Sequence, residues 1–568
     1  MLVTDEQPAL ALGVCFRLGD RWVTPAANEI SDVRVDAKSM DVLVALAEAA
    51  PAVVSGQALL ERVWPDVVVV DNVVHQAIAQ LRKALGDDAH APRYIANIRR
   101  RGYRLVAEIE RAPAILEKSI AVLPFTDMSE KKDQEYFADG MAEEIINLLA
   151  KVPDLLVPAR TSSFYFKGKQ AKIPDIAREL GVAHVLEGSV RLSANHMRVA
   201  AQLVRADNGY HLWSETYDRD PQDVFKVQDD IANAVVQALQ IKLMGGELDR
   251  PKGGTQNLEA YLLVLRAASG ANRFNKSSLD AASDYLDQAI ELDPSYGMAW
   301  SMLAYIVMLK VAIGSLAATE GYHRVEQLAQ HALQLSPDLA AAHTCLQSVY
   351  RNHDWDWAAA ETEGRRALAI DPANRGALQG SGMLSYTLGR WDDADRQLRL
   401  ALIRDPLNTW VIWGLGSIHY KAGRFAEAER TFRKLLELAP GFLSTHMLLG
   451  KTLLAEGKSE EALAIVEQEI DEPFRLLILP VVLQAAGRRA EADDALKALI
   501  AYWADRGAYF IAANYAYRGE HDLALQWLER AYKQKDPDLI GIVGEHLFKN
   551  IAEDPRFKAF LRKMKLPG

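Results

Sequence analysis

The sequence predicts a multidomain chain of three successive units: a small α+β domain, an α/β domain and an all-α array of helical repeats. Three observations support this order. An amphipathic helix and a basic hairpin lie before residue 108, a buried-strand pattern opens at Lys118, and the second half repeats at a spacing near 34 residues. A chain of 568 residues is too long for one hydrophobic core. We expect domains at residues 10–108, 118–243 and 257–568.

Composition and the N-terminal residues predict a cytoplasmic chain without a membrane segment. Two acidic residues and no basic residue precede the first apolar stretch, which is unlike a secretory signal. We find no apolar run near the roughly 20 residues that a membrane helix needs. Cys15 and Cys345 stand far apart, so neither a disulfide framework nor a cysteine zinc site is expected. The net charge is −11, yet five arginines and no acid lie between Arg93 and Arg104, so basic character is concentrated near the N-terminus.

The first domain begins with short alternating apolar pieces, which predict a small antiparallel sheet. These pieces are residues 15–18, 22–24, 29–30 and 33–35. A helical pattern then starts near Met40 and ends at Pro51. A second helix is expected over residues 55–63.

The third helix of this domain is predicted from Asp71, in the N-cap position, to Leu85 before Gly86. Its buried stripe, spaced by three and four residues, consists of Val74, Ile78, Leu81 and Leu85. The opposite face carries Asn72, Val73, Gln76, Ala77, Gln80 and Lys83. Gln and Asn side chains pair bidentately with adenine in a major groove, whereas a lysine more simply meets phosphate. This face is therefore a candidate for reading DNA bases.

Residues 94–106 predict a two-stranded hairpin that turns around Arg100, Arg101 and Gly102. A helix followed by a basic hairpin is winged-helix architecture. The plainer interpretation of these arginines is that they solvate the tip of the hairpin.

The segments VWPD, DNVVHQAIAQLRKALGDD, PRYI and RRRGYRLV resemble the OmpR-type winged helix, in particular its CadC-like and ToxR-like branch, over residues 10–108. The resemblance implies that the third helix enters the major groove of duplex DNA, with Gln76 and Gln80 among its base-facing residues. It also implies that Arg104 reaches the adjacent minor groove while Arg99 to Arg101 approach phosphates. Many relatives carry arginine at the position of Gln80, so the family's base preference does not carry over directly.

The surroundings of this domain differ from those in two related groups of regulators. About ten residues precede it, too few for the receiver domain of a two-component response regulator. Charged residues between 108 and 118 occupy the place of the membrane span in ToxR-like relatives. We therefore expect a one-component regulator that receives its signal through the downstream domains.

The middle domain opens with a buried-strand pattern at residues 118–125. We expect helices at 138–149, 174–180 and 224–243, and strands at 155–157, 184–192, 198–205 and 210–217. The segments SIAVLPF, YFADGMAEEII, ARTSSFYFKGK, IARELGVAHVLEGSVR and HLWSETYDRD resemble the TolB N-terminal-like domain, which occurs in bacterial regulators and beside some adenylate cyclases. No cyclase catalytic domain accompanies it here, so the resemblance implies a sensory or assembly module.

The sequence signals for a catalytic or metal-binding site are weak in this domain. Glu143 and Glu144 point about 100° apart on one helix, which is typical of helix surface. His184, His196 and His211 lack the spacing of a metal site. We also find no P-loop, dinucleotide fingerprint, zincin helix or nucleophile elbow in the chain. We therefore expect no enzyme activity, no cofactor and no metal.

The second half is a repeat array. Pro294, Pro337, Pro372, Pro406 and Pro440 stand 43, 35, 34 and 34 residues apart, a period typical of tetratricopeptide (TPR) helical hairpins. Glycines between paired helices and small alanines at close contacts keep the same register: Gly389, Gly423, Gly457, Ala394, Ala428 and Ala462. An insertion near residues 312–319 explains the longer first gap. Eight or nine hairpins fit residues 257–568 and should form one elongated solenoid.

The first helices of such repeats line a concave surface, which in this family usually holds peptides or protein segments. Tyr386, Trp413, Tyr420 and Lys451 lie at the positions expected to point inward. Aromatic anchors beside a cation suit a peptide ligand. Packing of these aromatics between repeats is an equally supported alternative.

Together these features predict a cytoplasmic transcriptional regulator whose partners are double-stranded DNA and a protein or peptide in the concave surface. A homodimer on DNA is left open. The alternative is a TPR interaction scaffold whose winged helix binds no DNA. A steep salt dependence of DNA binding, weakened when the hairpin arginines are removed, would distinguish the two.

Overall fold

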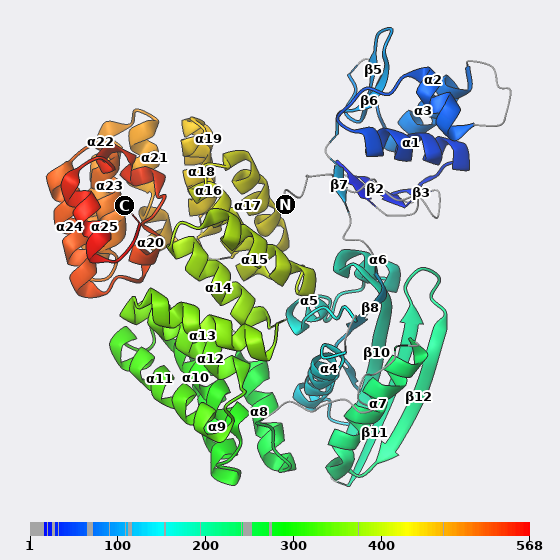
Figure 1. The fold of residues 1–568 in the computed structure, drawn as a ribbon, viewed down its shortest axis with the longest axis horizontal. Helices are drawn as coiled ribbons and strands as arrows, with labels where there is room; N and C mark the ends of the chain where they lie inside the picture. Colours follow the sequence, from blue (N-terminus) through cyan, green and yellow to red (C-terminus); the bar gives the residue numbers. More distant parts are fainter. Residues whose placement is uncertain are drawn as a thin grey trace. The chain divides into compact units, whose positions relative to one another are not determined.

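The computed structural model describes residues 16–567, apart from residues 20, 25–28, 32, 65–71, 90, 108, 112–115, 153–154, 194, 240, 242–252, 272–274, 373, 443 and 470. The described residues form two compact units. The first unit holds residues up to 119 together with 171–185 and 205–210, and the second holds the rest. Figure 1 labels the helices and strands named below.

In the described residues, the N-terminal region combines two small sheets with three helices (Figure 1). One sheet has the order β4-β3-β2-β1-β7, and β5 pairs with β6 in the other. Its strands are β1 Phe16–Leu18, β2 Arg21–Thr24, β3 Glu29–Ile30, β4 Val33–Arg34, β5 Ile95–Ile98, β6 Gly102–Leu105 and β7 Ile109–Arg111. The helices are α1 Ala37–Ala49, α2 Gly56–Val63 and α3 Asn72–Leu85. Asp36 and Ser55 start α1 and α2, because each side chain accepts a hydrogen bond from a backbone amide three residues later.

The middle region contains a sheet of order β12-β11-β10-β8, with β9 parallel to β10. Its strands are β8 Leu116–Val122, β9 Thr126–Asp127, β10 Val182–Ser193, β11 His196–Arg205 and β12 His211–Arg219. Its helices are α4 Glu135–Leu149, α5 Arg160–Phe164, α6 Ile173–Leu180, the 3-10 helix η2 Pro221–Asp223 and α7 Val224–Ala238. Apolar side chains of α4 and α7 share a core with the sheet, and Tyr261 and Leu265 of the next helix belong to it.

The C-terminal half consists of helices that pack in consecutive antiparallel pairs. The pairs are α8 Leu258–Ala271 with α9 Lys276–Leu292, α10 Gly297–Ala312 with α11 Ala318–Leu335, α12 Ala340–Val349 with α13 Trp357–Ile370, α14 Arg375–Thr387 with α15 Trp391–Arg404, α16 Thr409–Lys421 with α17 Phe425–Leu438, α18 Thr445–Ala455 with α19 Ser459–Val466, α21 Leu479–Ala485 with α22 Arg489–Trp503, and α23 Ala508–Tyr517 with α24 His521–Gln534. The short π-helix η3 Tyr350–Asp354 follows α12, and α20 Glu472–Leu476 precedes α21.

The residues that set the repeat register behave as the sequence predicts. Gly389, Gly423 and Gly457 have φ of 70°, 74° and 80°, the left-handed conformation that ends the first helix of a hairpin. Ala394, Ala428 and Ala462 are fully buried, because each lies where the paired helices approach most closely.

The last described residues do not form another hairpin. They fold into the 3-10 helices η4 Pro537–Gly541 and η5 His546–Ile551 and the helix α25 Pro555–Lys563. We call residues 536–566 the C-terminal segment. The prediction that repeats continue almost to the end of the chain is therefore wrong for this segment. Its many apolar side chains pack within the array rather than into a new helical pair.

A buried polar junction joins α5 of the middle region to the array. The Asp405 carboxylate, fully buried, accepts hydrogen bonds from the Ser162 backbone amide at 3.0 Å and the Ser162 hydroxyl at 2.5 Å. Arg375 Nη1 and Asn408 Nδ2 also donate to Asp405, at 3.0 and 2.8 Å. Each of the two buried Asp405 oxygens thus accepts two hydrogen bonds from protein donors, which replace its hydrogen bonds to water.

Most predicted elements are confirmed within one to four residues, but several features differ. The expected strand at 155–157 is a single bridge residue, and the helix expected to reach residue 243 ends at Ala238 as α7. The structure adds β7 and α5, which were not expected. Within the described part of the chain, no helix is both long and apolar enough to cross a bilayer.

Candidate nucleic-acid interface and repeat groove

The helix α3 separates its two faces as the sequence predicts, except at Ala77. This residue was expected on the outward face but is buried, because it lies one turn from Val74 and Leu81 of the inner stripe. Val74, Ile78, Leu81 and Leu85 are at most 2% exposed and form the inner stripe. On the outer side, the side chains of Gln76, Gln80 and Lys83 are exposed, and Val73 is half-buried. The backbone of Asn72 starts the helix, but its side chain lies outside the described residues. The amides and the lysine are thus available to a ligand from solvent.

Gln80 has one contact that orients it. Its Oε1 accepts a hydrogen bond from the Ser39 hydroxyl of α1 at 3.1 Å. This bond leaves the side-chain nitrogen of Gln80 without a hydrogen-bond acceptor among the described residues, while the residue as a whole is exposed. Gln76 lies one turn earlier on the same exposed side of α3.

The hairpin β5–β6 presents three consecutive exposed arginines, Arg99, Arg100 and Arg101. The turn closes through a hydrogen bond from the Arg101 amide to the Ile98 carbonyl at 2.8 Å, and Arg100 takes a left-handed φ of 62°. Three cations at the tip of one tight turn make a local positive charge in a chain with a net charge of −11.

Arg104 lies two residues beyond the turn on β6, between the buried Tyr103 and Leu105. Its side chain is half-buried, and its Nε has no hydrogen-bond partner among the described residues. Because this Nε is also buried, it is not open to a ligand in this arrangement.

Two residues that the sequence interpretation overlooked hold the hairpin against α3. The buried Asp87 carboxylate accepts hydrogen bonds from the backbone amides of Arg93, Tyr94 and Ile95, at 2.7, 3.2 and 2.9 Å. Arg82 of α3 donates from Nη2 to the Ile95 carbonyl at 2.9 Å. The start of β5 is thereby fixed to the end of α3. The sequence does carry one signal for Asp87, because an acidic residue directly follows Gly86, the glycine after α3.

The inward positions of the array meet the chain's own C-terminal segment. The buried Tyr420 donates its hydroxyl to Glu545 Oε1 at 2.7 Å, and Lys451 Nζ donates to Glu545 Oε2 at 2.5 Å. The Tyr386 hydroxyl lies beside Gly541, where an added Cβ would be 3.1 Å from it. Lys421, which the sequence did not single out, donates to Glu545 Oε2 at 2.9 Å.

The charges around Glu545 are strongly coupled. Burial alone would raise the pKa of its carboxyl, but Lys421 and Lys451 lower that pKa well below the usual range. Burial lowers the pKa of Lys421 to about 8, and Glu545 opposes this shift. The carboxylate is thus ionised at neutral pH and held by two cations.

Trp413 differs from the other three predicted groove residues. It is half-buried and packs against the large core of the array, with its ring centroid 6.3 Å from that of Trp410. Trp410 is 42% exposed and also contacts Phe442 edge-on, with ring centroids 5.0 Å apart. Trp413 therefore packs in this aromatic group.

Comparison with protein families gives three matches. Residues 31–105 match the family described as transcriptional regulatory protein, C terminal. Residues 380–441 and 419–468 match two models of the tetratricopeptide repeat.

Several curated relatives share parts of this chain. A putative adenylate cyclase 3 of Rhizobium meliloti is 46% identical over 34% of this chain and 32% of its own length. The transcriptional activator CadC of Escherichia coli is 37% identical over 16% of this chain and 19% of its own. The transcriptional regulator HilA of Salmonella typhimurium is 25% identical over half of each chain, 50% and 51%. The chain thus spans between about a fifth and a half of the length of these relatives.

Among solved structures, the DNA-binding domain of E. coli CadC is similar with 34% identity and a TM-score of 0.16, covering 18% of this chain and 99% of that domain. Pseudomonas aeruginosa PilF is similar with 22% identity and a TM-score of 0.30, covering 37% and 93%. The chain therefore combines a winged-helix domain of the transcriptional regulatory protein C-terminal family, with CadC-, ToxR- and HilA-like homologues, and tetratricopeptide repeats.

Proposed function

We propose that the chain is a one-component transcriptional regulator that binds duplex DNA through its winged helix and responds to an effector or protein partner through its other domains. One observation carries this proposal. The exposed amides of α3 and the exposed arginines of the β5–β6 hairpin belong to one rigid arrangement, because Arg82 and Asp87 fix the hairpin to α3. A base-reading helix beside a cationic hairpin suits simultaneous contact with base edges and phosphates.

Each residue has a role in this proposal. Gln76 and Gln80, with Asn72 and Val73 at the start of α3, contact base edges in the major groove. Lys83 and the three turn arginines Arg99 to Arg101 contact phosphates, while Arg104 enters the minor groove. The exposure of Gln76, Gln80 and Lys83 on α3 and of the three turn arginines supports these assignments.

The remaining regions supply the response. In the proposal, residues 10–108 are the DNA-binding domain, residues 118–243 are a TolB N-terminal-like sensory or assembly domain, and residues 257–568 are the partner-binding array. The chain acts in the cytoplasm and catalyses no reaction, in keeping with the regulators among its relatives. Partner binding changes the arrangement or self-association of the chain, and so the pairing of winged helices on tandem DNA sites.

The DNA-binding part of the proposal is tested with duplexes selected from a random-sequence pool by the full chain. Mobility shifts across a salt series should give a steep decrease in affinity with salt. Replacing Arg99, Arg100 and Arg101 with alanine should lower the magnitude of that log–log slope by about 2 to 3. A matched control replaces three exposed arginines of the array, Arg365, Arg396 and Arg399, and so removes the same charge. Equal slopes for the two triple variants would refute DNA binding through the hairpin.

A further inference from the structure

The C-terminal segment crosses the inner side of the array instead of extending it. Lys421 of α16 donates to the Gly541 carbonyl at 2.5 Å. Trp357 of α13 donates from Nε1 to the Met564 carbonyl at 3.0 Å. Lys535, directly before the segment, donates to the His353 carbonyl at 3.2 Å. These contacts join residues between 94 and 207 positions apart in the sequence, when the Glu545 contacts are included. The segment thus touches hairpins far from the one that it follows.

The polar centre of this contact is a clamp for one carboxylate. Tyr420, Lys421 and Lys451 come from the first helices of two successive hairpins, and all three converge on Glu545. All four residues are at most 6% exposed. Two buried ammonium groups need a buried anion, because an unpaired charge in the interior is strongly unfavourable. Glu545 supplies that anion in cis.

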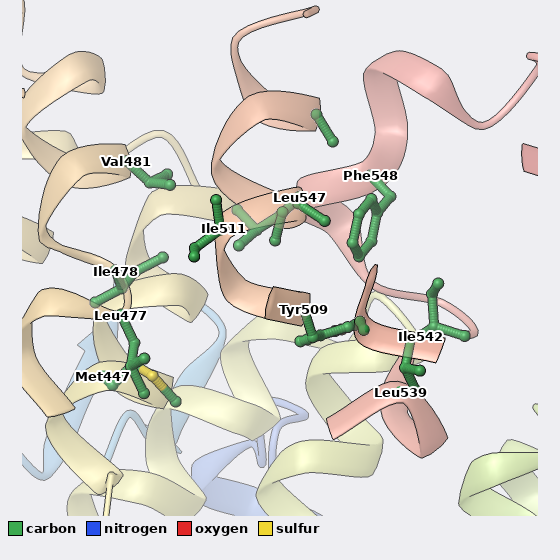
Figure 2. Close-up of a cluster of buried hydrophobic side chains, with 14 of the residues drawn as sticks. Met447, Leu477, Ile478, Val481, Tyr509, Ile511, Leu539, Ile542, Leu547 and Phe548 are labelled. Atoms are coloured by element: carbon green, nitrogen blue, oxygen red, sulfur yellow. The ribbon is translucent and has the colours of Figure 1, made fainter. Parts of the chain in front are cut away.

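Apolar side chains flank the clamped carboxylate on both sides. Leu539 and Ile542 precede Glu545 and Leu547 and Phe548 follow it, each at most 5% exposed. Figure 2 shows them beside the α23 residues Tyr509 and Ile511. The Phe548 and Tyr509 rings meet edge-on with centroids 5.6 Å apart. The segment therefore presents a short pattern in which two apolar residues precede an acidic residue and two more follow it.

This arrangement has the form of a ligand in a groove rather than of a repeat. Its two 3-10 helices lack the paired second helix that defines a hairpin. Its charged anchor is recognised by first helices, the elements that line the concave side of such arrays. The two residues of the predicted peptide site that reach Glu545, Tyr420 and Lys451, are thus already engaged by a peptide-like segment of the same chain.

We propose that residues 536–566 are an intramolecular ligand of the array, and that its groove recognises an apolar segment through a single carboxylate. The external partner that fits the groove is a peptide with the same pattern, which competes with the C-terminal segment for the Lys421 and Lys451 clamp. This inference rests on the proposed function in one respect: the array is the partner-binding part of the chain.

The test uses the full chain and a fluorescent peptide with the sequence of residues 536–550. In the Glu545→Gln chain the cis contact is weakened, so the peptide should bind this chain about 10-fold more tightly than the wild-type chain. A peptide with Glu545→Gln should bind the same variant chain about 10-fold more weakly than the natural peptide. Adding Lys451→Met to the variant chain should remove this difference between the peptides.

The matched control is Glu553→Gln. Glu553 lies in the same segment, its side chain is 91% exposed, and it pairs with Lys558. This variant should bind the peptide as the wild type does. Hydrogen exchange gives an independent readout: amides of residues 538–551 should exchange faster in the Glu545→Gln chain and at the wild-type rate in the Glu553→Gln chain.

Two results would overturn the inference. If the Glu545→Gln chain bound no peptide and kept wild-type exchange rates, the segment would be a permanent part of the core. If both peptides bound equally, the groove would not read a carboxylate. Mobility shifts on the same chains keep the two proposals apart, because a loss of DNA binding with intact peptide binding contradicts the proposed function alone.

Discussion

Gly102 lies where the hairpin of the winged helix meets the residue before α2. Its φ is 126°, and a Cβ there would overlap the carbonyl oxygen of Val54. This close approach lets Val54 and Tyr103 exchange two backbone hydrogen bonds of 2.9 Å. The glycine is therefore required by both its conformation and its neighbour.

Replacing Gly102 with alanine should destabilise the winged helix by about 2–4 kcal/mol, because the strained backbone and the overlap both add to the cost. The midpoint of the first unit's thermal transition in the full chain measures this. Gly56→Ala is the control, since an added Cβ at Gly56 meets open space. Equal midpoints for the two variants would contradict the steric argument.

Gln76 offers a second prediction at this scale. Replacing it with alanine should weaken binding to a selected duplex by about 1–3 kcal/mol and relax the preference for one base pair, because a bidentate contact is lost. Competition between the selected site and single-base variants measures both effects. Gln57→Ala is the matched control, because Gln57 is a helical glutamine of the same domain that bonds to Glu61. An unchanged base preference in the Gln76 variant would count against base reading.

The outward positions of Gln76, Gln80 and Lys83 on α3 were predictable, because helical periodicity indicates which side chains point away from a core. Ala77, at the border of the two faces, was assigned wrongly and is buried. The Asp87 and Arg82 contacts were not, because they depend on where a later strand begins. The groove residues show the same limit. Nothing local to Tyr420 or Lys451 indicates Glu545, which lies 125 and 94 residues further along the chain.

At the scale of elements, the junction between α5 and the array depends on Asp405. Replacing Asp405 with alanine should destabilise the second unit by about 3–5 kcal/mol, because it leaves buried donors of Ser162 and the Arg375 guanidinium without an acceptor. Urea unfolding followed by circular dichroism measures the change. Asp393→Ala, which removes an exposed carboxylate paired with Arg396, is the control. A change as small as that of the control would show that the junction contributes little.

The contact of the C-terminal segment should weaken in acid. The folded-state pKa of Glu545 lies below its ordinary value of 4.5, because Lys421 and Lys451 outweigh burial. The stabilisation is therefore fully present above about pH 4.5 and is lost as pH falls toward the folded-state pKa. The difference in melting temperature between the wild type and Glu545→Gln should be largest near about pH 7 and shrink toward about pH 3. A difference that stays constant over this range would exclude an ionised Glu545 as the anchor.

Elements with strong periodicity or a fixed repeat were predictable, whereas short ones were not. The glycines and alanines at constant spacing located the hairpins, because helix ends and close helix contacts require them. The five residues of α5 and the three of β7 carry too little pattern to stand out. The C-terminal segment contains enough apolar residues to suggest another repeat, but its glycines and alanines do not stand at the repeat spacing.

At the scale of the whole second unit, α8 belongs to two cores. It pairs with α9, while its Tyr261 and Leu265 fill the core of the middle region. Gln228 of α7 donates to the Tyr261 hydroxyl at 2.8 Å, and Gly140 of α4 lies against Leu265.

A fragment of the middle region that ends at residue 256 should therefore be less stable than one that ends at residue 271. The shorter fragment exposes the apolar surface that Tyr261 and Leu265 cover, and burying two large side chains contributes about 3–6 kcal/mol. Differential scanning calorimetry of the two fragments measures the difference. Equal melting temperatures would show that the predicted boundary near residue 243 already encloses the whole core.

The double membership of α8 also bears on how such chains are inherited. Recombination before α8 would remove Tyr261 and Leu265 from the core of the middle region. Recombination directly after α8 would separate α9 from the helix with which it pairs. Exchange of arrays between regulators of this layout should therefore carry the middle region along with the first hairpin. New partners would then arise by changes in later repeats, while the joint itself is kept.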